Sequence, residues 1–152
     1  MRVGVISDTH GLLRPEMLGR LRGVDHILHA GDVGSCSILD ALRAVAPLTA
    51  IRGNVDVSGA CACLPATEAV EVGGKLFYLV HSVTDLDIEP RAADVTMVVS
   101  GHTHRAEIRG KNGVVYLNPG SVGPRRFNLP VTMGFVTIAE GKVHAEIARL
   151  DV

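Results

Sequence analysis

The chain has 152 residues, 47% of them hydrophobic and 20% charged, which is enough apolar material to fold as one domain. Its formal net charge is −1, so long-range charge gives no reason to expect binding to nucleic acid or to a membrane surface. No apolar stretch reaches the roughly 20 residues of a membrane-spanning helix, and a strand-like run begins at once and leaves no room for a signal peptide. We therefore expect a single cytoplasmic domain over residues 1–152.

The first half of the chain alternates strand-like and helical patterns. Residues 14–21 have apolar side chains at helical spacing, with Pro15 in the first turn. Residues 35–46 form a clearer amphipathic helix, for which Ser35 is a plausible N-cap. The chain also contains short runs rich in Val and Ile, which predict buried strands. The predicted strands cover residues 3–7, 26–30, 48–52, 76–80 and 95–100.

The second half is richer in strand pairs. Residues 68–72 and 75–80 flank Gly73-Gly74, which predicts a hairpin. Residues 135–139 and 143–148 flank a second short turn of the same kind. The sequence thus indicates a fold of the α/β or α+β class, without repeats or linkers.

The three cysteines are Cys36, Cys61 and Cys63. An odd number with a Cys-x-Cys pair is unlike the disulfide framework of a small secreted protein. A metal site built on this pair would need partners at similar spacing, and none occurs. The pattern favours reduced thiols in a cytoplasmic protein.

Each of the five predicted strands ends in polar residues that could bind metal. Loops at one edge of a sheet converge in space, so these residues are expected to gather. Asp8 and His10 lie two residues apart, and if the chain there is extended their side chains point to the same face of the strand. The same holds for His102 and His104. The full set is Asp8, His10, Asp32, Asn54, His81, His102 and His104.

This donor set predicts a centre with two metal ions. Imidazole with carboxylate suits manganese, iron, nickel or zinc better than calcium or magnesium. Seven donors exceed what one tetrahedral ion with an open position needs. They fit a pair of ions that share a bridging carboxylate, a centre suited to a phosphate anion.

The order of these motifs resembles the calcineurin-like metallophosphoesterase family, in particular its small bacterial and archaeal phosphodiesterase branch. The resemblance covers nearly the whole chain, because five motifs follow five strands in the family's order. They are Asp8-Thr9-His10, Gly31-Asp32, Gly53-Asn54-Val55-Asp56, His81 and Gly101-His102-Thr103-His104, followed by Asn118-Pro119-Gly120-Ser121.

The resemblance implies a two-sheet β-sandwich flanked by helices, with a dimetal site at the strand ends. It implies a phosphodiesterase, with monoesters as further substrates, in which a metal-bridging hydroxide attacks phosphorus. Manganese is the expected ion, and nickel, iron and zinc are the alternatives. By this resemblance Asp32 bridges the ions, the first ion is held by Asp8, His10 and His104, and the second by Asn54, His81 and His102.

Val55 departs from the family pattern. Many members carry a histidine there, a candidate general acid for the leaving group, and valine cannot donate a proton. The main alternative function is a protein-interaction scaffold on the same fold, as in a retromer subunit of eukaryotes. Such proteins are expected to have lost ligands, whereas all seven are present here. The expected partner is a small phosphate ester, and a homo-oligomer is left open.

Several other polar residues have a structural interpretation. His29 is expected to be a buried structural histidine rather than a ligand, and Asp56 to cap a turn. Arg52 could reach a substrate phosphate or face outward. Arg125 and Arg126 could line the pocket or only face solvent.

Overall fold

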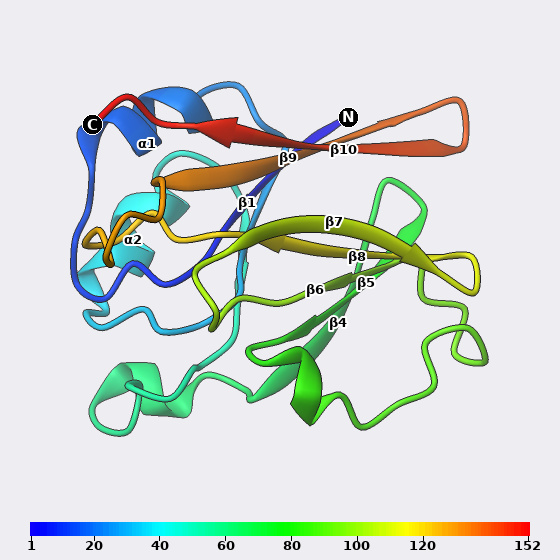
Figure 1. Ribbon diagram of the computed structural model, residues 1–152, viewed down its shortest axis with the longest axis horizontal. Coiled ribbons are helices and arrows are strands. Elements are labelled where there is room, and N and C mark those ends of the chain that lie inside the picture. The colour runs from blue at the N-terminus through cyan, green and yellow to red at the C-terminus, as the bar shows by residue number, and fades with distance from the viewer.

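Two five-stranded sheets pack face to face in the computed structural model, which describes residues 1–152 (Figure 1). The first sheet has the order β10-β9-β1-β2-β3. Its strands are β1 (Arg2–Ile6), β2 (His26–His29), β3 (Leu48–Ala50), β9 (Thr132–Ala139) and β10 (Lys142–Arg149). The second sheet has the order β4-β5-β6-β8-β7. Its strands are β4 (Thr67–Val72), β5 (Lys75–Val80), β6 (Met97–Val99), β7 (Ala106–Lys111) and β8 (Val114–Pro119).

Alternation along β1 explains how one sheet serves two cores. Val3 and Val5 face the second sheet and pack in a buried cluster with Phe77 and Leu79. Ile6, on the opposite face, packs in a separate cluster beneath the helices. Because successive side chains of a strand point to opposite faces, an apolar run such as that of β1 is buried on both sides.

Two helices cover the outer face of the first sheet (Figure 1). Helix α1 (Pro15–Leu21) buries Met17 and Leu21, and helix α2 (Ser37–Arg43) buries Ile38, Leu39 and Leu42. Two short 3₁₀ helices follow, η1 (Ala60–Cys63) and η2 (Val83–Asp85). No helix in the structure has both the length and the apolar character needed to cross a membrane.

Both helices are shorter than the sequence predicts, and the N-cap prediction at Ser35 is wrong. Helix α2 begins after Cys36, and no side chain caps it. The Ser35 hydroxyl lies 2.9 Å from that of Ser37 instead of a free backbone amide. The helix therefore begins without a side-chain cap.

The β7–β8 hairpin was not predicted. All six residues of β7 are exposed, and Ile108 is its only large apolar residue, so the segment has no apolar run of the kind used to predict the other strands. The turn does carry a hairpin signal, since Asn112 and Gly113 both have positive φ, at 53° and 78°. The predicted hairpins at β4–β5 and β9–β10 are confirmed.

The prediction of reduced thiols is wrong for two of the three cysteines. Cys36 and Cys61 form a disulfide, with Cα atoms 5.7 Å apart. Spacing along the chain does not show this contact, because it depends on how the loop before α2 meets η1. Cys63 remains free and exposed.

The register of the parallel strands brings the motif loops together. Ile6 of β1 pairs with His29 of β2, and beyond these strands the Asp8 amide donates to the Gly31 carbonyl at 3.0 Å. The His10 amide likewise donates to the Asp32 carbonyl at 2.9 Å. The first two motifs therefore lie side by side at the carboxyl edge of the sheet.

Candidate metal centre

The predicted ligands sit on turns rather than on extended chain. Asp8, His10 and Asp32 have φ of 57°, 46° and 56°, and His102 and His104 have φ of 73° and 62°. The condition that would place each pair on one face of a strand is therefore not met. Left-handed backbone at residues other than glycine costs about 1–3 kcal/mol each and gathers at functional sites. The side chains converge through these turns.

Three side chains form the first group. The Oδ1 atom of the buried Asp8 lies 3.6 Å from His10 Nε2 and 3.4 Å from His104 Nε2. The two histidine nitrogens are 3.3 Å apart. Three ligand atoms thus face one point, at distances that suit one cation between them.

The second group consists of Asp8, Asp32 and His81, so it shares the Asp8 carboxylate with the first. Asp32 Oδ2 lies 3.2 Å from His81 Nε2 and 3.5 Å from His10 Nε2. His81 Nδ1 donates to the Ala30 carbonyl at 2.7 Å, which turns Nε2 towards the carboxylates. Asp32 Oδ2 therefore lies close to a histidine of each group.

Unpartnered buried atoms show that this centre fits a cation. Asp8 Oδ1 and His81 Nε2 are buried without a hydrogen-bond partner, as is His104 Nδ1. Asp8 Oδ1 and His81 Nε2 lie 3.9 Å apart. An unsatisfied buried polar atom costs about 1–3 kcal/mol, and a metal ion between these two atoms would satisfy both.

The two carboxylates differ in their electrostatic surroundings. Burial raises the pKa of Asp8, although a hydrogen bond from Ser7 opposes this. Burial also opposes ionisation of Asp32, but the His81 ring, whose Nε2 lies 3.2 Å from Oδ2, and a hydrogen bond from the Val55 amide hold its pKa well below the usual range. Burial lowers the pKa of His81, but the nearby Asp32 carboxylate and the hydrogen bond to the Ala30 carbonyl raise it overall.

Asn54 and His102 lie beside this cluster. The His102 ring is exposed and packs edge-on against that of His81, with centroids 5.3 Å apart. Asn54 is exposed and, with His81, lines a pocket of about 480 Å³. The structure thus brings five predicted ligands into close contact and sets the other two next to His81.

Two glycines allow the motif loops to approach the aspartates. A Cβ atom at Gly53 would overlap the Asp32 carboxylate. One at Gly101 would overlap Ser7 Oγ and come within 2.6 Å of Asp8 Oδ2. No larger residue fits at either position without moving a predicted ligand.

Asp56 has a larger role than the predicted turn cap. Its buried carboxylate accepts hydrogen bonds from the amides of Val33, Gly34 and Gly53, at 2.9–3.1 Å. It thereby joins the loop that carries Asp32 to the loop that carries Asn54. The Gly-Asn-x-Asp motif contains this residue, but sequence spacing does not show that its carboxylate oxygens accept hydrogen bonds from a different loop.

His29 is buried and structural, as predicted. Its Nδ1 accepts from the Gly31 amide, and its Nε2 lies 3.0 Å from Thr9 Oγ1, which donates to the Val33 carbonyl. Burial lowers its pKa to about 4. The ring is therefore neutral, with its proton on Nε2, and braces the first two motifs.

The remaining predicted polar residues have separate roles. The Asn118 amide donates to the Gly101 carbonyl and to Thr103 Oγ1, so it supports the turn that carries the last two histidines. Arg52 lines the Asn54 pocket but donates to the Leu64 carbonyl. Arg125 donates to the Val152 carbonyl. Arg126 lies close enough to His104 to lower its pKa, after the larger effect of burial.

Comparison with known proteins agrees with the geometry. Residues 1–141 match the profile of the calcineurin-like phosphoesterase superfamily domain. A probable metallophosphoesterase of Methanothermobacter thermautotrophicus is 35% identical, over 98% of this chain and 92% of that protein. The chain belongs to the calcineurin-like phosphoesterase superfamily.

Solved structures share the whole fold. A structure described as that of a novel archaeal phosphodiesterase superposes with a TM-score of 0.79 at 21% identity, over 97% of this chain and all of that one. The zinc complex of wild-type Vps29 from Entamoeba histolytica superposes with a TM-score of 0.73 at 25% identity, over 98% of this chain and 99% of that one. The predicted two-sheet sandwich is confirmed, and the candidate metal-binding residues lie near one end of it.

Proposed function

We propose that the protein hydrolyses phosphodiesters, and monoesters less well, with two divalent transition-metal ions. The observation that carries this proposal is the pair of buried, unpartnered donor atoms, Asp8 Oδ1 and His81 Nε2, that face each other at 3.9 Å. The likeness to an archaeal phosphodiesterase supports the diester preference. The mixed imidazole and carboxylate donors support manganese, with nickel, iron and zinc as alternatives.

Seven side chains would hold the ions. Asp32 would bridge, the first ion would be held by Asp8, His10 and His104, and the second by Asn54, His81 and His102. Ions bound there would supply Lewis-acid stabilisation of the phosphoryl oxygens and a water acidified to hydroxide. Hydrolysis would form a bond between a water oxygen and phosphorus and break the bond from phosphorus to the leaving oxygen, which would take up a proton from solvent.

The protein's own contribution is positioning. Asp8 Oδ2 accepts from Ser7 Oγ at 2.7 Å and from the His102 amide at 3.1 Å, which leaves Oδ1 free to bind an ion. Asp32 Oδ1 accepts from the Val55 amide, which leaves Oδ2 free. One oxygen of each carboxylate is thus fixed by the chain while the other faces the centre.

Metal content and turnover test the proposal together. Protein reconstituted with manganese is expected to bind two ions per chain by elemental analysis and to hydrolyse bis(4-nitrophenyl) phosphate until a chelator is added. A scaffold protein without turnover would leave the ester intact, whether or not it binds ions. One ion per chain, or two ions without hydrolysis, contradicts the proposal.

Two substitutions separate the bridging role from a terminal one. Asp32→Ala is expected to abolish turnover and to lower occupancy of both ions, whereas His104→Ala should empty mainly one. His144→Ala, at an exposed histidine on β10, is the matched control and should keep two ions and full activity. Two ions and near-normal turnover in Asp32→Ala would show that the carboxylate does not bridge.

A further inference from the structure

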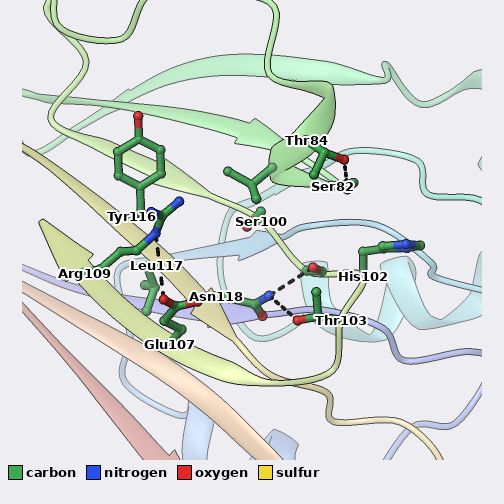
Figure 2. A pocket seen from close by; sticks show the side chains of 12 residues that line it. Ser82, Thr84, Ser100, His102, Thr103, Glu107, Arg109, Tyr116, Leu117 and Asn118 are labelled. Carbon is green, nitrogen blue, oxygen red and sulfur yellow. Dashed lines mark hydrogen bonds and ion pairs between the residues drawn. The ribbon is translucent and has the colours of Figure 1, made fainter. Parts of the chain in front are cut away.

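A second pocket adjoins the metal centre on the outer face of the second sheet. It has a volume of about 260 Å³, and its lining runs from the loop of His102 across β8 and β7 to η2. Figure 2 shows Arg109 and Tyr116 together at one end of this pocket and His102 at the other. We call it the hydroxyl pocket, after the side chains of Ser82, Thr84, Ser100 and Thr103 that line it.

The hydroxyl groups of this pocket have unused hydrogen-bonding capacity. Ser100 Oγ makes no hydrogen bond within the protein. Thr103 Oγ1 accepts from the Asn118 amide and the Arg105 backbone, so its own proton is free to donate. Ser82 and Thr84 share one bond at 2.9 Å, which uses only one of their two protons. Each hydroxyl has one donor and two acceptor sites, so the pocket offers both kinds to a ligand.

The far end of the pocket carries charges that cancel. Arg109 Nε lies 3.8 Å from Glu107 Oε1, and its guanidinium lies 4.9 Å from the centre of the Tyr116 ring (Figure 2). With one cation and one anion, this end has no excess positive charge to attract a second phosphate. The Tyr116 ring is already covered by Arg109, so it offers little surface on which a base could stack.

These features select among possible occupants. Only three of the twelve lining residues are hydrophobic, so the pocket does not suit an alkyl or aryl group. Its mixture of donors, acceptors and a balanced ion pair suits a neutral group with several hydroxyls. Its volume is below the ~300–1,000 Å³ of pockets that enclose a drug-sized ligand, which fits one sugar ring rather than a whole nucleotide.

The hydroxyl pocket lies next to the place where a substrate phosphate would bind. His102 lines the hydroxyl pocket, whereas its neighbour His81 lines the separate pocket that contains Asn54. The two pockets have no residue in common, yet the two rings are 5.3 Å apart. A phosphorus atom bound next to these rings would have one substituent near each pocket, as a diester requires.

We propose that the hydroxyl pocket binds the sugar ring of a phosphodiester whose phosphate lies at the metal centre. This proposal rests on the function proposed above and adds the chemical class of one ester group. Arg109, Glu107 and the hydroxyls of Ser100 and Thr84 are its specificity-determining residues.

Two matched substrates test the proposal on the manganese-loaded protein. One is the 4-nitrophenyl diester of ribose 5-phosphate, and the other is 4-nitrophenyl cyclohexylmethyl phosphate, which has similar bulk and no ring hydroxyls. Both release 4-nitrophenol, so kcat/KM is measured by the same absorbance. The sugar ester is expected to be preferred by about tenfold, the size of effect expected from one or two hydrogen bonds.

Variants of β7 supply the control. Arg109→Ala and Glu107→Gln are expected to reduce the sugar preference to about twofold or less, mainly through KM for the sugar ester. Lys111→Ala changes the next residue on the same face of β7, outside the pocket, and should keep the full preference.

The outcomes distinguish the two proposals. If neither ester is hydrolysed, the proposed function is wrong. If both are hydrolysed equally well by the native protein, or if Arg109→Ala and Lys111→Ala change the preference alike, the phosphoesterase function stands and the sugar pocket is wrong.

Discussion

Val55 shows how a residue can keep its backbone role while its side chain loses a chemical one. Its amide donates to Asp32 Oδ1 at 3.0 Å, so the backbone still orients the proposed bridging ligand. Its side chain is 47% exposed and has no proton to give to a leaving group. The family resemblance implies a histidine at this position as a general acid, and the exposure leaves room for one here.

We predict that kcat/KM of the native protein depends steeply on the pKa of the leaving group and that Val55→His reduces this dependence. General acid catalysis is worth about 10²–10⁴-fold and matters most for a basic leaving group. The measurement is kcat/KM for an alkyl and an aryl diester in both proteins, each with two bound ions. Equal gains on both esters would mean that water or another residue already supplies the proton.

His29 makes stability depend on pH. Its folded-state pKa of about 4 lies below the ordinary 6.5 because the ring is buried. The unfolded chain therefore takes up a proton below pH 6.5 that the folded chain does not, and the folded state loses stability until the pH reaches about 4. At one pKa unit per 1.36 kcal/mol, the full loss is about 3 kcal/mol.

We predict that the free energy of unfolding of metal-free protein falls between pH 6.5 and pH 4 and that His29→Gln removes most of this fall. The measurement is urea unfolding in chelator at several pH values. His144→Gln, at the exposed histidine on β10, is the control. A slope in His29→Gln as steep as in the native protein would assign the effect to other groups.

At the scale of elements, two links join the loop after β2 to the loop after β3. The Asp56 carboxylate accepts three backbone hydrogen bonds across these loops, and the Cys36–Cys61 disulfide joins the same loops farther from the centre. The proposed ligands Asp32 and Asn54 lie on these loops. Their relative position therefore depends on the two links.

We predict that Asp56→Asn weakens metal binding without removing a ligand. An amide nitrogen in place of one oxygen would face a backbone N–H, at a cost of about 1–3 kcal/mol. Manganese affinity is measured by calorimetric titration, and the free energy of unfolding is measured alongside it. Asp94→Asn, at an exposed aspartate without a side-chain hydrogen bond, should behave as the native protein. Unchanged affinity in Asp56→Asn would show that the loops hold their positions without it.

We also predict that denatured, unreduced protein reacts with one equivalent of iodoacetamide, at Cys63, and with three after reduction. A cross-link that spans 25 residues is worth about 3 kcal/mol of unfolding free energy in the chain-entropy model. Cys36→Ser should therefore lower the thermal midpoint, whereas Cys63→Ser should not. Three reactive thiols before reduction would disprove the disulfide.

At the scale of the molecule, both sheets contribute to the centre. The parallel strands β1, β2 and β3 of the first sheet and β5 and β6 of the second all end near it, so it lies where the two layers meet. Without a cation, buried donor atoms there remain unpartnered. Bound ions would therefore stabilise the whole fold.

We predict that manganese raises the thermal midpoint of the native protein and that His104→Ala shows a smaller increase. Free ligand at 100 times its dissociation constant contributes about 2.7 kcal/mol to the unfolding free energy. The measurement is scanning calorimetry with and without manganese, with magnesium as a control of equal charge. No shift at millimolar manganese would mean that the folded protein has no such site.

The sequence by itself indicated the fold class, the hairpins β4–β5 and β9–β10 but not β7–β8, and the presence of polar residues at the ends of the predicted strands. Alternating apolar runs and turn residues are local signals, so they can be read without knowing the contacts. The β7 strand was missed because Ile108 is its only large apolar residue, so it contains no apolar run.

Tertiary structure alone decided how the candidate ligands meet. Asp8 and His104 are 96 residues apart, and their contact depends on sheet packing and on left-handed turns that no periodicity encodes. The same holds for the hydrogen bonds of Asp56, the Cys36–Cys61 disulfide and the hydroxyl pocket, each of which joins separate loops or strands. Residue types and their order along the chain determined which chemistry is available, whereas long-range packing determined which atoms face one another, because distances across a fold are set by contacts and not by sequence spacing.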